Sequence, residues 1–360
     1  MAKSVYIHIP FCKSKCKYCS FVSFAKRDSI NSYIEKLLEE IAFYYKGECL
    51  NTLYFGGGTP SLLEPNSVSD IISKFNLSND CEVTFEMNPD DVIEDYMNEL
   101  IKFGVNRISM GAQSFDDETL KLIGRRHNSR QIFEAVRIAQ RSGFKNISLD
   151  LIYGLPNQTL ESLTLDLDKI TSLGIQHIST YGLKIEEESF WGKNQPNNLP
   201  DDDMQADMYI LINQYLASKG YDRYEISNFS KKGYESKHNL NYWDNAEYYG
   251  FGIAAHGYVD GIRYSNLTDL KRYIENSTNH QDEHLVSKEE QLEEEIFLGF
   301  RKESGVNVDK IRNKYELDFE EKYRDVLVKY EPEYIVKTDK GYKLTLQGVL
   351  LSNNILSEFI

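Results

Sequence analysis

Short apolar runs alternate with longer amphipathic segments along the first half of the chain. The apolar runs are rich in β-branched and aromatic residues, which is typical of buried strands. They occur at 5–9, 52–56, 82–87, 107–111, 147–154 and 177–183. The segments between them, such as 30–45 and 129–143, have apolar residues at helical spacing. This repeated order of strand, helix and strand predicts right-handed βαβ units and a parallel sheet.

The number of predicted strands narrows the fold class to α/β with a barrel-like sheet. Six strands favour a partial (β/α)6 TIM-like barrel over a closed barrel of eight strands. A doubly wound sheet is the alternative architecture for the same order of elements.

The alternation of apolar strands and amphipathic helices is replaced by other patterns at two points further along the chain. A helix is expected at 203–219, and the segment after it is rich in Tyr, Asn and Gly. From about 285 the pattern predicts a charged amphipathic helix, two further helices, a short hairpin at "DKG" and a final helix. We therefore expect a barrel domain at 1–220, a connecting region at 221–284 and a smaller helical, winged-helix-like domain at 285–360.

Composition and charge restrict the class of protein. The chain has 360 residues, 41% of them hydrophobic, which is typical of globular proteins. The formal charge of −15 disfavours binding to nucleic acid through phosphate contacts, although winged helices often bind DNA. No apolar run approaches the roughly 20 residues that span a bilayer. The first residues lack the apolar stretch of a secretory signal, so such a signal is not expected. A cytoplasmic protein is expected, in which the isolated Cys49 and Cys81 are buried small residues rather than disulfide partners.

Three further cysteines lie close together directly after the first predicted strand. Cys12, Cys16 and Cys19 fall within eight residues, at the strand end where barrel enzymes have their active sites. Thiolates suit iron–sulfur clusters, and three of them leave one iron of a cubane open to another ligand. The alternatives are a zinc site with His8 as fourth ligand, redox thiols and a chance cluster.

The spacing Cys-x3-Cys-x2-Cys, with Tyr18 before the third cysteine, resembles the radical S-adenosylmethionine (SAM) superfamily. This resemblance implies that Cys12, Cys16 and Cys19 hold a [4Fe–4S] cluster whose open iron is chelated by the methionine moiety of SAM. It also implies that the reduced cluster cleaves SAM to a 5′-deoxyadenosyl radical.

Glycine or polar residues follow each later strand. "GGGTPS" after the second strand offers bare backbone to a ligand, although a tight turn also needs glycines. Glu86 at the end of the third strand suits an ammonium group, but a solvated carboxylate is the ordinary alternative. Because the strand ends of a barrel meet at one mouth, these residues are expected to converge on the cysteine loop.

The resemblance assigns most of these positions to the SAM site. Arg125 is implied as a clamp for the SAM carboxylate, with the adjacent Arg126 as its rival, and Asp150 as the acceptor for the ribose hydroxyls. Gln113 is implied near the ribose and Gly182 near the adenine. The full set of implied SAM-site residues is Tyr6, Tyr18, Gly57, Gly58, Thr59, Glu86, Gln113, Arg125, Asp150 and Gly182.

"YIHIPFC", "GGGTPS", "QSF" and "DLIYGLP" are together similar to the oxygen-independent coproporphyrinogen III oxidases (HemN) and their relatives, over nearly the whole chain. The chain departs from the oxidase pattern at Phe21, where the oxidases have a fourth cysteine, and only five residues precede Tyr6. Both departures match the HemW group, whose members are thought to bind cluster, SAM and haem and to deliver haem without decarboxylating coproporphyrinogen.

"HNLNYW" (238–243) resembles a motif of the same group. The resemblance implies haem binding by His238 as an axial ligand, with Tyr242 and Trp243 flanking the porphyrin. A packed structural histidine is the ordinary alternative, and His256 is the rival ligand.

The expected function is therefore that of a haem chaperone with a [4Fe–4S] cluster, SAM and haem as cofactors. Its expected partners are acceptor haemoproteins, with respiratory enzymes at the membrane as the family expectation, and it is expected to be a monomer or a SAM- or cluster-dependent dimer. The alternative is an oxygen-independent coproporphyrinogen III oxidase, which converts two propionates to vinyl groups. A regulatory protein with a nucleic-acid-binding winged module fits the charge least well.

Overall fold

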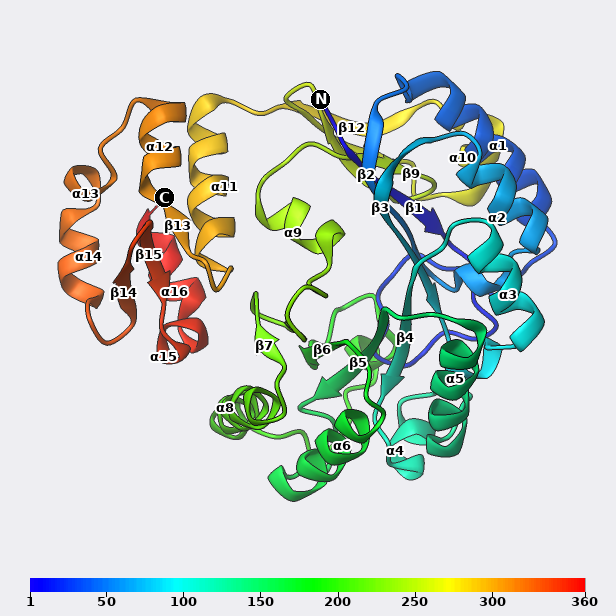
Figure 1. The fold of residues 1–360 in the computed structure, drawn as a ribbon, viewed down its shortest axis with the longest axis horizontal. Helices are drawn as coiled ribbons and strands as arrows, with labels where there is room; N and C mark the ends of the chain where they lie inside the picture. The colour runs from blue at the N-terminus through cyan, green and yellow to red at the C-terminus, as the bar shows by residue number, and fades with distance from the viewer. Residues whose placement is uncertain (360) are drawn as a thin grey trace.

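A curved sheet of nine strands forms the centre of the computed structural model, which describes residues 1–359 (Figure 1). Its order is β7-β8-β6-β5-β4-β3-β2-β1-β9. The six parallel strands are β1 (Ser4–Ile9), β2 (Cys49–Gly57), β3 (Asn76–Met87), β4 (Arg107–Gln113), β5 (Ile147–Tyr153) and β6 (His177–Gly182). They neighbour one another in chain order. A doubly wound sheet reverses its strand order, so the partial barrel is confirmed and the alternative is wrong.

Helices alternate with these strands and cover the outer face of the sheet (Figure 1). They are α1 (Ile30–Tyr44), α2 (Pro65–Ile72), α3 (Glu94–Lys102), α4 (Asp117–Leu122), α5 (Ser129–Ser142) and α6 (Leu160–Ser172), followed by α7 (Phe190–Lys193) and α8 (Asp202–Ser218). Helix α5 shows how local sequence sets the bounds. It begins with a reciprocal capping box between Asn128 and Gln131, and it ends at Gly143, whose φ is 106°.

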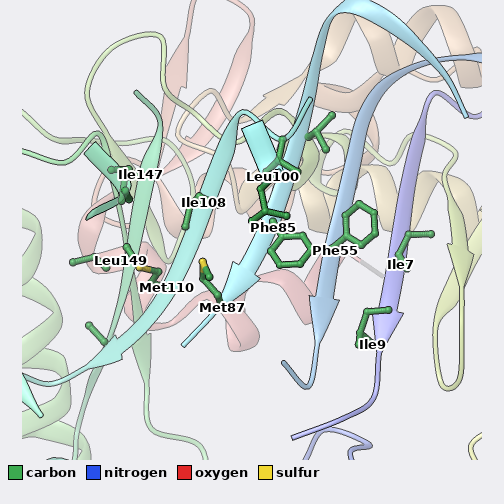
Figure 2. Close-up of a cluster of buried hydrophobic side chains, with 14 of the residues drawn as sticks. Ile7, Ile9, Phe55, Phe85, Met87, Leu100, Ile108, Met110, Ile147 and Leu149 are labelled. Atoms are coloured by element: carbon green, nitrogen blue, oxygen red, sulfur yellow. The ribbon is translucent and has the colours of Figure 1, made fainter. Parts of the chain in front are cut away.

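The alternation of side chains along each strand separates the core from the interior of the barrel. Phe85 and Met87 of β3 point to the outer core with neighbours such as Leu100 of α3, as Figure 2 shows. Glu86 lies between them in sequence, so its side chain points to the opposite face, which is the barrel interior. This period of two explains how one strand supplies both the core and polar groups for a site.

The region after α8 contains short strands that the sequence pattern did not predict. β7 (Asp222–Arg223) and β8 (Asn228–Ser230) extend the sheet beyond β6, and β9 (Tyr249–Phe251) pairs with β1. A separate antiparallel sheet contains β10 (His256–Val259), β11 (Ile262–Asn266) and β12 (His280–Leu285), and two helices, α9 (Lys237–Trp243) and α10 (Leu270–Glu275), accompany these strands. Most of these strands are too short for a pattern of period two to be visible.

Helix α9 is anchored to the inner face of the sheet by β3. Glu82 accepts hydrogen bonds from the Ser236 hydroxyl at 3.4 Å and from the backbone N–H groups of Lys237 at 3.2 Å and His238 at 3.1 Å. A carboxylate at the start of a helix satisfies free N–H donors. Glu82 comes before Glu86 along β3, so α9 lies toward the amino end of the strands, away from their carboxyl ends.

The C-terminal part has its own hydrophobic core and a small sheet of order β13-β15-β14. Its elements are α11 (Lys288–Phe300), β13 (Val306–Asn307), α12 (Val308–Tyr315), α13 (Phe319–Lys322), α14 (Arg324–Tyr330), β14 (Ile335–Thr338), β15 (Gly341–Leu344), α15 (Leu346–Leu350) and α16 (Ser352–Leu356). The hairpin at "DKG" is confirmed, because Thr338 pairs with Gly341. Three helices rather than two separate α11 from β14, and two short helices follow the hairpin. The proposed domain boundaries stay a prediction.

Two expectations about single features can also be compared with the structure. Cys81 is buried as predicted, but Cys49 is exposed, because it begins β2 with its side chain on the solvent side. Within residues 1–359, no helix has both the length and the apolar character required to cross a membrane.

Candidate functional site

The carboxyl ends of the parallel strands surround a cavity of about 430 Å³. Residues from the cysteine loop and from the ends of β2 to β6 line it. Among them are the predicted Cys12, Cys16, Tyr18, Cys19, Gly57, Gly58, Thr59, Glu86, Gln113, Arg125, Asp150 and Gly182. The structure thus brings together residues that are up to 170 positions apart in the chain, while their roles toward a ligand stay predictions.

The cysteine loop is closed by backbone hydrogen bonds. The N–H of Cys12 donates to Phe24 at 3.1 Å, and the N–H of Phe24 donates to Pro10 at 2.7 Å. The N–H of Cys19 donates to Cys16 at 3.2 Å, which forms a tight turn between two of the cysteines. All three cysteines are free and half-buried, so their thiols are available at the mouth of the cavity.

His8 does not complete a metal site with the cysteines. Its Nε2 is 3.1 Å from the carbonyl oxygen of Val22, and its Nδ1 is 3.1 Å from the hydroxyl of Tyr6. Burial lowers the pKa of His8 to about 4. No three His, Cys, Asp or Glu side chains of residues 1–359 converge on one metal-ion position. Both ring nitrogens of His8 are engaged by Tyr6 and Val22, and this argues against a zinc site with His8 as fourth ligand.

The surroundings of the thiols suit a thiolate-held cluster. Thr59 Oγ1 donates to Cys12 Sγ at 3.5 Å, and Arg125 Nη1 lies 3.6 Å from Cys16 Sγ. Positive charge and donated hydrogen bonds both favour a thiolate. Burial raises the pKa of the Cys19 thiol in the absence of iron. Three soft ligands beside a guanidinium therefore fit the donor set of an iron–sulfur cluster.

Arg125 has one buried N–H donor that lacks a hydrogen-bond partner among the described residues. Its Nη2 donates to Asn88 Oδ1 and to the carbonyl oxygen of Gly111, both at 2.6 Å, which fixes the guanidinium plane. Its Nε is buried without a hydrogen-bond partner among the described residues. Buried donors are rarely left unpaired, so this group fits a ligand that brings an acceptor. The rival Arg126 instead pairs with Asp90 at 2.9 Å.

Two half-buried carboxyl groups line the cavity. Burial raises the pKa of Glu86 to about 7, although Tyr54 Oη donates to it at 2.5 Å and the N–H of Gly57 at 3.2 Å. Burial likewise raises the pKa of Asp150 to about 6. Such shifted groups in a cleft are typical of functional sites. A cationic ligand would favour their ionised forms.

Two glycines of the "GGGTPS" loop are required by close contacts within the protein. Gly57 has a φ of 108°, and a Cβ there would lie 2.6 Å from the ring of His8. A Cβ on Gly58 would lie 2.7 Å from the carbonyl oxygen of Phe11. The contacts that require glycine therefore come from β1 and the start of the cysteine loop. Both glycines also line the cavity, and the contact of their backbone with a ligand stays a prediction.

Two predicted residues lie outside the lining of the cavity. Tyr6 is half-buried beneath it, where its ring lies 6.0 Å from that of Tyr54. His238 is only 1% exposed, and its ring stacks on Tyr54 with the centroids 4.9 Å apart. Its Nδ1 is 2.8 Å from Thr52 Oγ1 and its Nε2 is 2.8 Å from Tyr242 Oη. Both nitrogens are occupied, so iron ligation by His238 requires one of these hydrogen bonds to break.

Sequence reasoning missed Asn88, which bridges the two sides of the cavity. Its amide donates to Thr59 Oγ1 at 3.2 Å while its oxygen accepts from Arg125. The sequence does offer one indication of this role. Asn88 is two residues after Glu86, and residues two apart in an extended chain lie on the same face. Gln113 is also unusual, because its φ of 68° is a strained left-handed conformation at a cavity wall.

Comparison with protein families matches both parts of the chain. The model described as "Radical SAM superfamily" matches residues 6–170, and the "HemN C-terminal domain" model matches residues 286–351. Among solved structures, the coproporphyrinogen III oxidase HemN from Escherichia coli has a TM-score of 0.86 and 23% identity, and the match covers 99% of this chain and 89% of that one. At this identity the likeness establishes the fold alone.

Curated relatives are more similar and span the full length. The protein named "Heme chaperone HemW" from Lactococcus lactis is 40% identical over 99% of this chain and 97% of the relative. The protein of the same name from Bacillus subtilis is 38% identical over 99% of both chains. Together with the radical SAM match and the cysteine loop, these similarities show that the chain belongs to the HemW family of the radical SAM superfamily.

Proposed function

We propose that this protein is a haem chaperone that binds haem, a [4Fe–4S] cluster and SAM and transfers haem to acceptor haemoproteins. The similarity to proteins named heme chaperone over 99% of the chain carries this proposal. Phe21 supports it, because this residue lines the cysteine cavity at the position where the resemblance to the oxidases calls for a fourth cysteine.

The residues of the cavity suggest how the cofactors are held. Cys12, Cys16 and Cys19 supply the thiolates for the cluster, which in this superfamily provides the electron that cleaves SAM. Arg125 stabilises the Cys16 thiolate and offers a donor to the SAM carboxylate. Glu86 lies where it can pair with the SAM ammonium group.

The nucleoside half of SAM has matching groups on the other side of the cavity. Asp150 on β5 is a carboxylate acceptor for ribose hydroxyls, and Gln113 on β4 holds its side chain at the same wall. Gly182 ends β6 and leaves its backbone accessible to the adenine. In this proposal these residues bind and orient SAM, and none of them acts on the haem itself.

The place of action and the partners are also part of the proposal. All five cysteines are free, and a site of reduced thiols suits the cytoplasm, where disulfides are rare. Acceptor haemoproteins, respiratory enzymes among them, are the proposed partners. The charge of −15 disfavours nucleic acid as a partner.

An anaerobic assay separates the chaperone from the oxidase. Cluster-reconstituted protein is supplied with SAM, reductant and coproporphyrinogen III, and mass spectrometry follows protoporphyrinogen and 5′-deoxyadenosine. The same preparation is loaded with haem and mixed with an apo-haemoprotein, whose Soret absorbance reports transfer. Haem transfer without a porphyrin product is the expected result, and repeated decarboxylation turnovers would show that the protein is an oxidase.

A further inference from the structure

A second cavity, of about 740 Å³, lies between the connecting region and helix α11. One face of α11 lines it through Glu290, Glu294 and Phe297, which are spaced four and three residues apart. The opposite face of α11 carries Leu292 and Ile296, which pack in the C-terminal core. Figure 1 shows α11 beside the C-terminal elements and α9 between it and the barrel. This cavity shares no lining residue with the cysteine cavity and is distinct from it.

The other walls of this cavity come from the region around "HNLNYW" and from the sheet of β10 to β12. Tyr242 and Tyr248 line it, with their rings edge to face at 4.6 Å, and Val286 follows β12. The hydroxyl of Tyr242 is the partner of the buried His238. The motif thus presents a tyrosine ring to the cavity, while its histidine stays inside the barrel. Aromatic and aliphatic walls suit a flat apolar ligand.

His284 on β12 is the histidine that lines this cavity. Its side chain is 61% exposed, and its Nε2 lies 2.8 Å from Glu290 Oε1. Its Nδ1 has no hydrogen-bond partner among residues 1–359. Histidines that ligate metals in proteins commonly donate their other ring N–H to a carboxylate, which fixes the tautomer and increases ligand basicity. His284 with Glu290 has this arrangement, with one nitrogen available.

The charges at this cavity are already balanced in part. Arg263 forms a two-pronged pair with Glu294, at 2.7 Å for each nitrogen. Glu290 is occupied by His284. Arg263 also donates to Asn245 at 3.0 Å, and Glu293 adds a third carboxylate to the lining. Because the fork of Arg263 is already occupied, the propionates of a haem are expected to extend toward solvent at the open side.

We infer that haem binds in this second cavity, with His284 as the iron ligand, Glu290 as its orienting carboxylate and Tyr242, Tyr248 and Phe297 beside the porphyrin. The inference rests on the proposed function, because it names the site for the haem that the chaperone carries. It replaces His238 as the ligand and gives that residue a structural role between Thr52 and Tyr242.

Haem titration of the full chain tests the site. Haemin is added to wild-type protein and to His284→Ala, and absorbance and electron paramagnetic resonance report the axial ligand. His284→Ala is expected to weaken haem binding by more than about tenfold and to change the low-spin signal, with partial rescue by added imidazole. His256→Ala removes another exposed histidine that does not line the cavity, and it is expected to behave like wild type.

Two further variants test the cavity independently of the His284 substitution. Leu298→Trp fills the cavity without touching a ligand and is expected to abolish haem binding. Glu290→Gln keeps a side chain that can form the capping box with Ser287 and is expected to retain haem with a shifted spectrum. Wild-type haem binding by both His284→Ala and Leu298→Trp, with loss in His238→Ala, would overturn the site and leave the chaperone function standing. Absence of haem binding in wild type would overturn the proposed function and this site with it.

Discussion

Tyr54 of β2 donates a hydrogen bond of 2.5 Å to Glu86 of the neighbouring strand β3. The ring of Tyr54 is also stacked on the ring of His238, with the two centroids 4.9 Å apart. One side chain therefore contacts both the carboxyl group of the candidate SAM cavity and the helix that carries "HNLNYW". This contact is a direct physical connection between the two regions, and a shift of α9 would move the donor to Glu86.

Tyr54→Phe removes this donor and keeps the ring that stacks on His238. A hydrogen bond to a charged group contributes about 1.5–3 kcal/mol, so SAM affinity is expected to fall by about tenfold or more. Isothermal titration of cluster-loaded protein with SAM measures the change. Tyr45→Phe is the matched control, since the hydroxyl of Tyr45 bonds the backbone of Glu48 away from the cavity. Equal SAM affinity of Tyr54→Phe and wild type would contradict a role of this bond in the site.

SAM binding is expected to depend on pH through Glu86. Burial raises the pKa of Glu86 to about 7, so the carboxyl becomes neutral as the pH falls below that value. The ammonium of SAM prefers the ionised form, and its affinity should therefore decrease below pH 7 by up to about tenfold per pH unit. Equilibrium dialysis at several pH values measures this slope. Glu86→Gln should bind SAM weakly with a smaller slope, to which Asp150 still contributes.

The two adjacent arginines are expected to respond differently to the same change. Arg125→Lys loses the fork that contacts Cys16, Asn88 and Gly111 at once, and an ammonium cannot replace it. SAM affinity should fall by about tenfold or more while iron content stays near wild type. Arg126→Lys keeps a charge opposite Asp90 and should change SAM affinity less than about threefold. Iron and sulfide analysis with SAM titration checks both, and similar losses in the two variants would refute the assignment of Arg125.

Glu40 of α1 is expected to stabilise the connection to the later part of the chain. Its buried carboxyl accepts from Asn266 at 2.6 Å and the N–H of Gly252 at 2.9 Å, and from the hydroxyl of Tyr273. Glu40→Ala leaves these buried donors unpaired and should lower the free energy of unfolding by about 3 kcal/mol or more.

Urea denaturation measures the effect of this substitution. Glu39→Ala is the matched control, because Glu39 forms an exposed pair with Lys36 and should change the free energy of unfolding by less than about 0.5 kcal/mol. A loss of similar size in both variants would show that the hydrogen bonds of Glu40 are not the cause.

Local sequence determined the main architecture of this protein. Apolar runs marked the six parallel strands, and the capping residues of helices such as α5 set their bounds. The same alternation placed Glu86 on the interior face between Phe85 and Met87. The cysteine loop and the polar strand ends were therefore identifiable as one site, because parallel strands bring their carboxyl ends together.

Only the tertiary structure decided what packs against what. Helix α9 is fixed by Glu82, which is 156 residues before His238, and no local pattern records a contact of that span. The pairing of β9 with β1 and the meeting of α9, β12 and α11 around the second cavity have the same origin. Periodicity shows which face of an element is buried, but the partner that buries it depends on the packing of distant segments. For this reason the sequence identified "HNLNYW" as a motif, whereas the structure showed that its histidine is enclosed and its tyrosine faces a cavity.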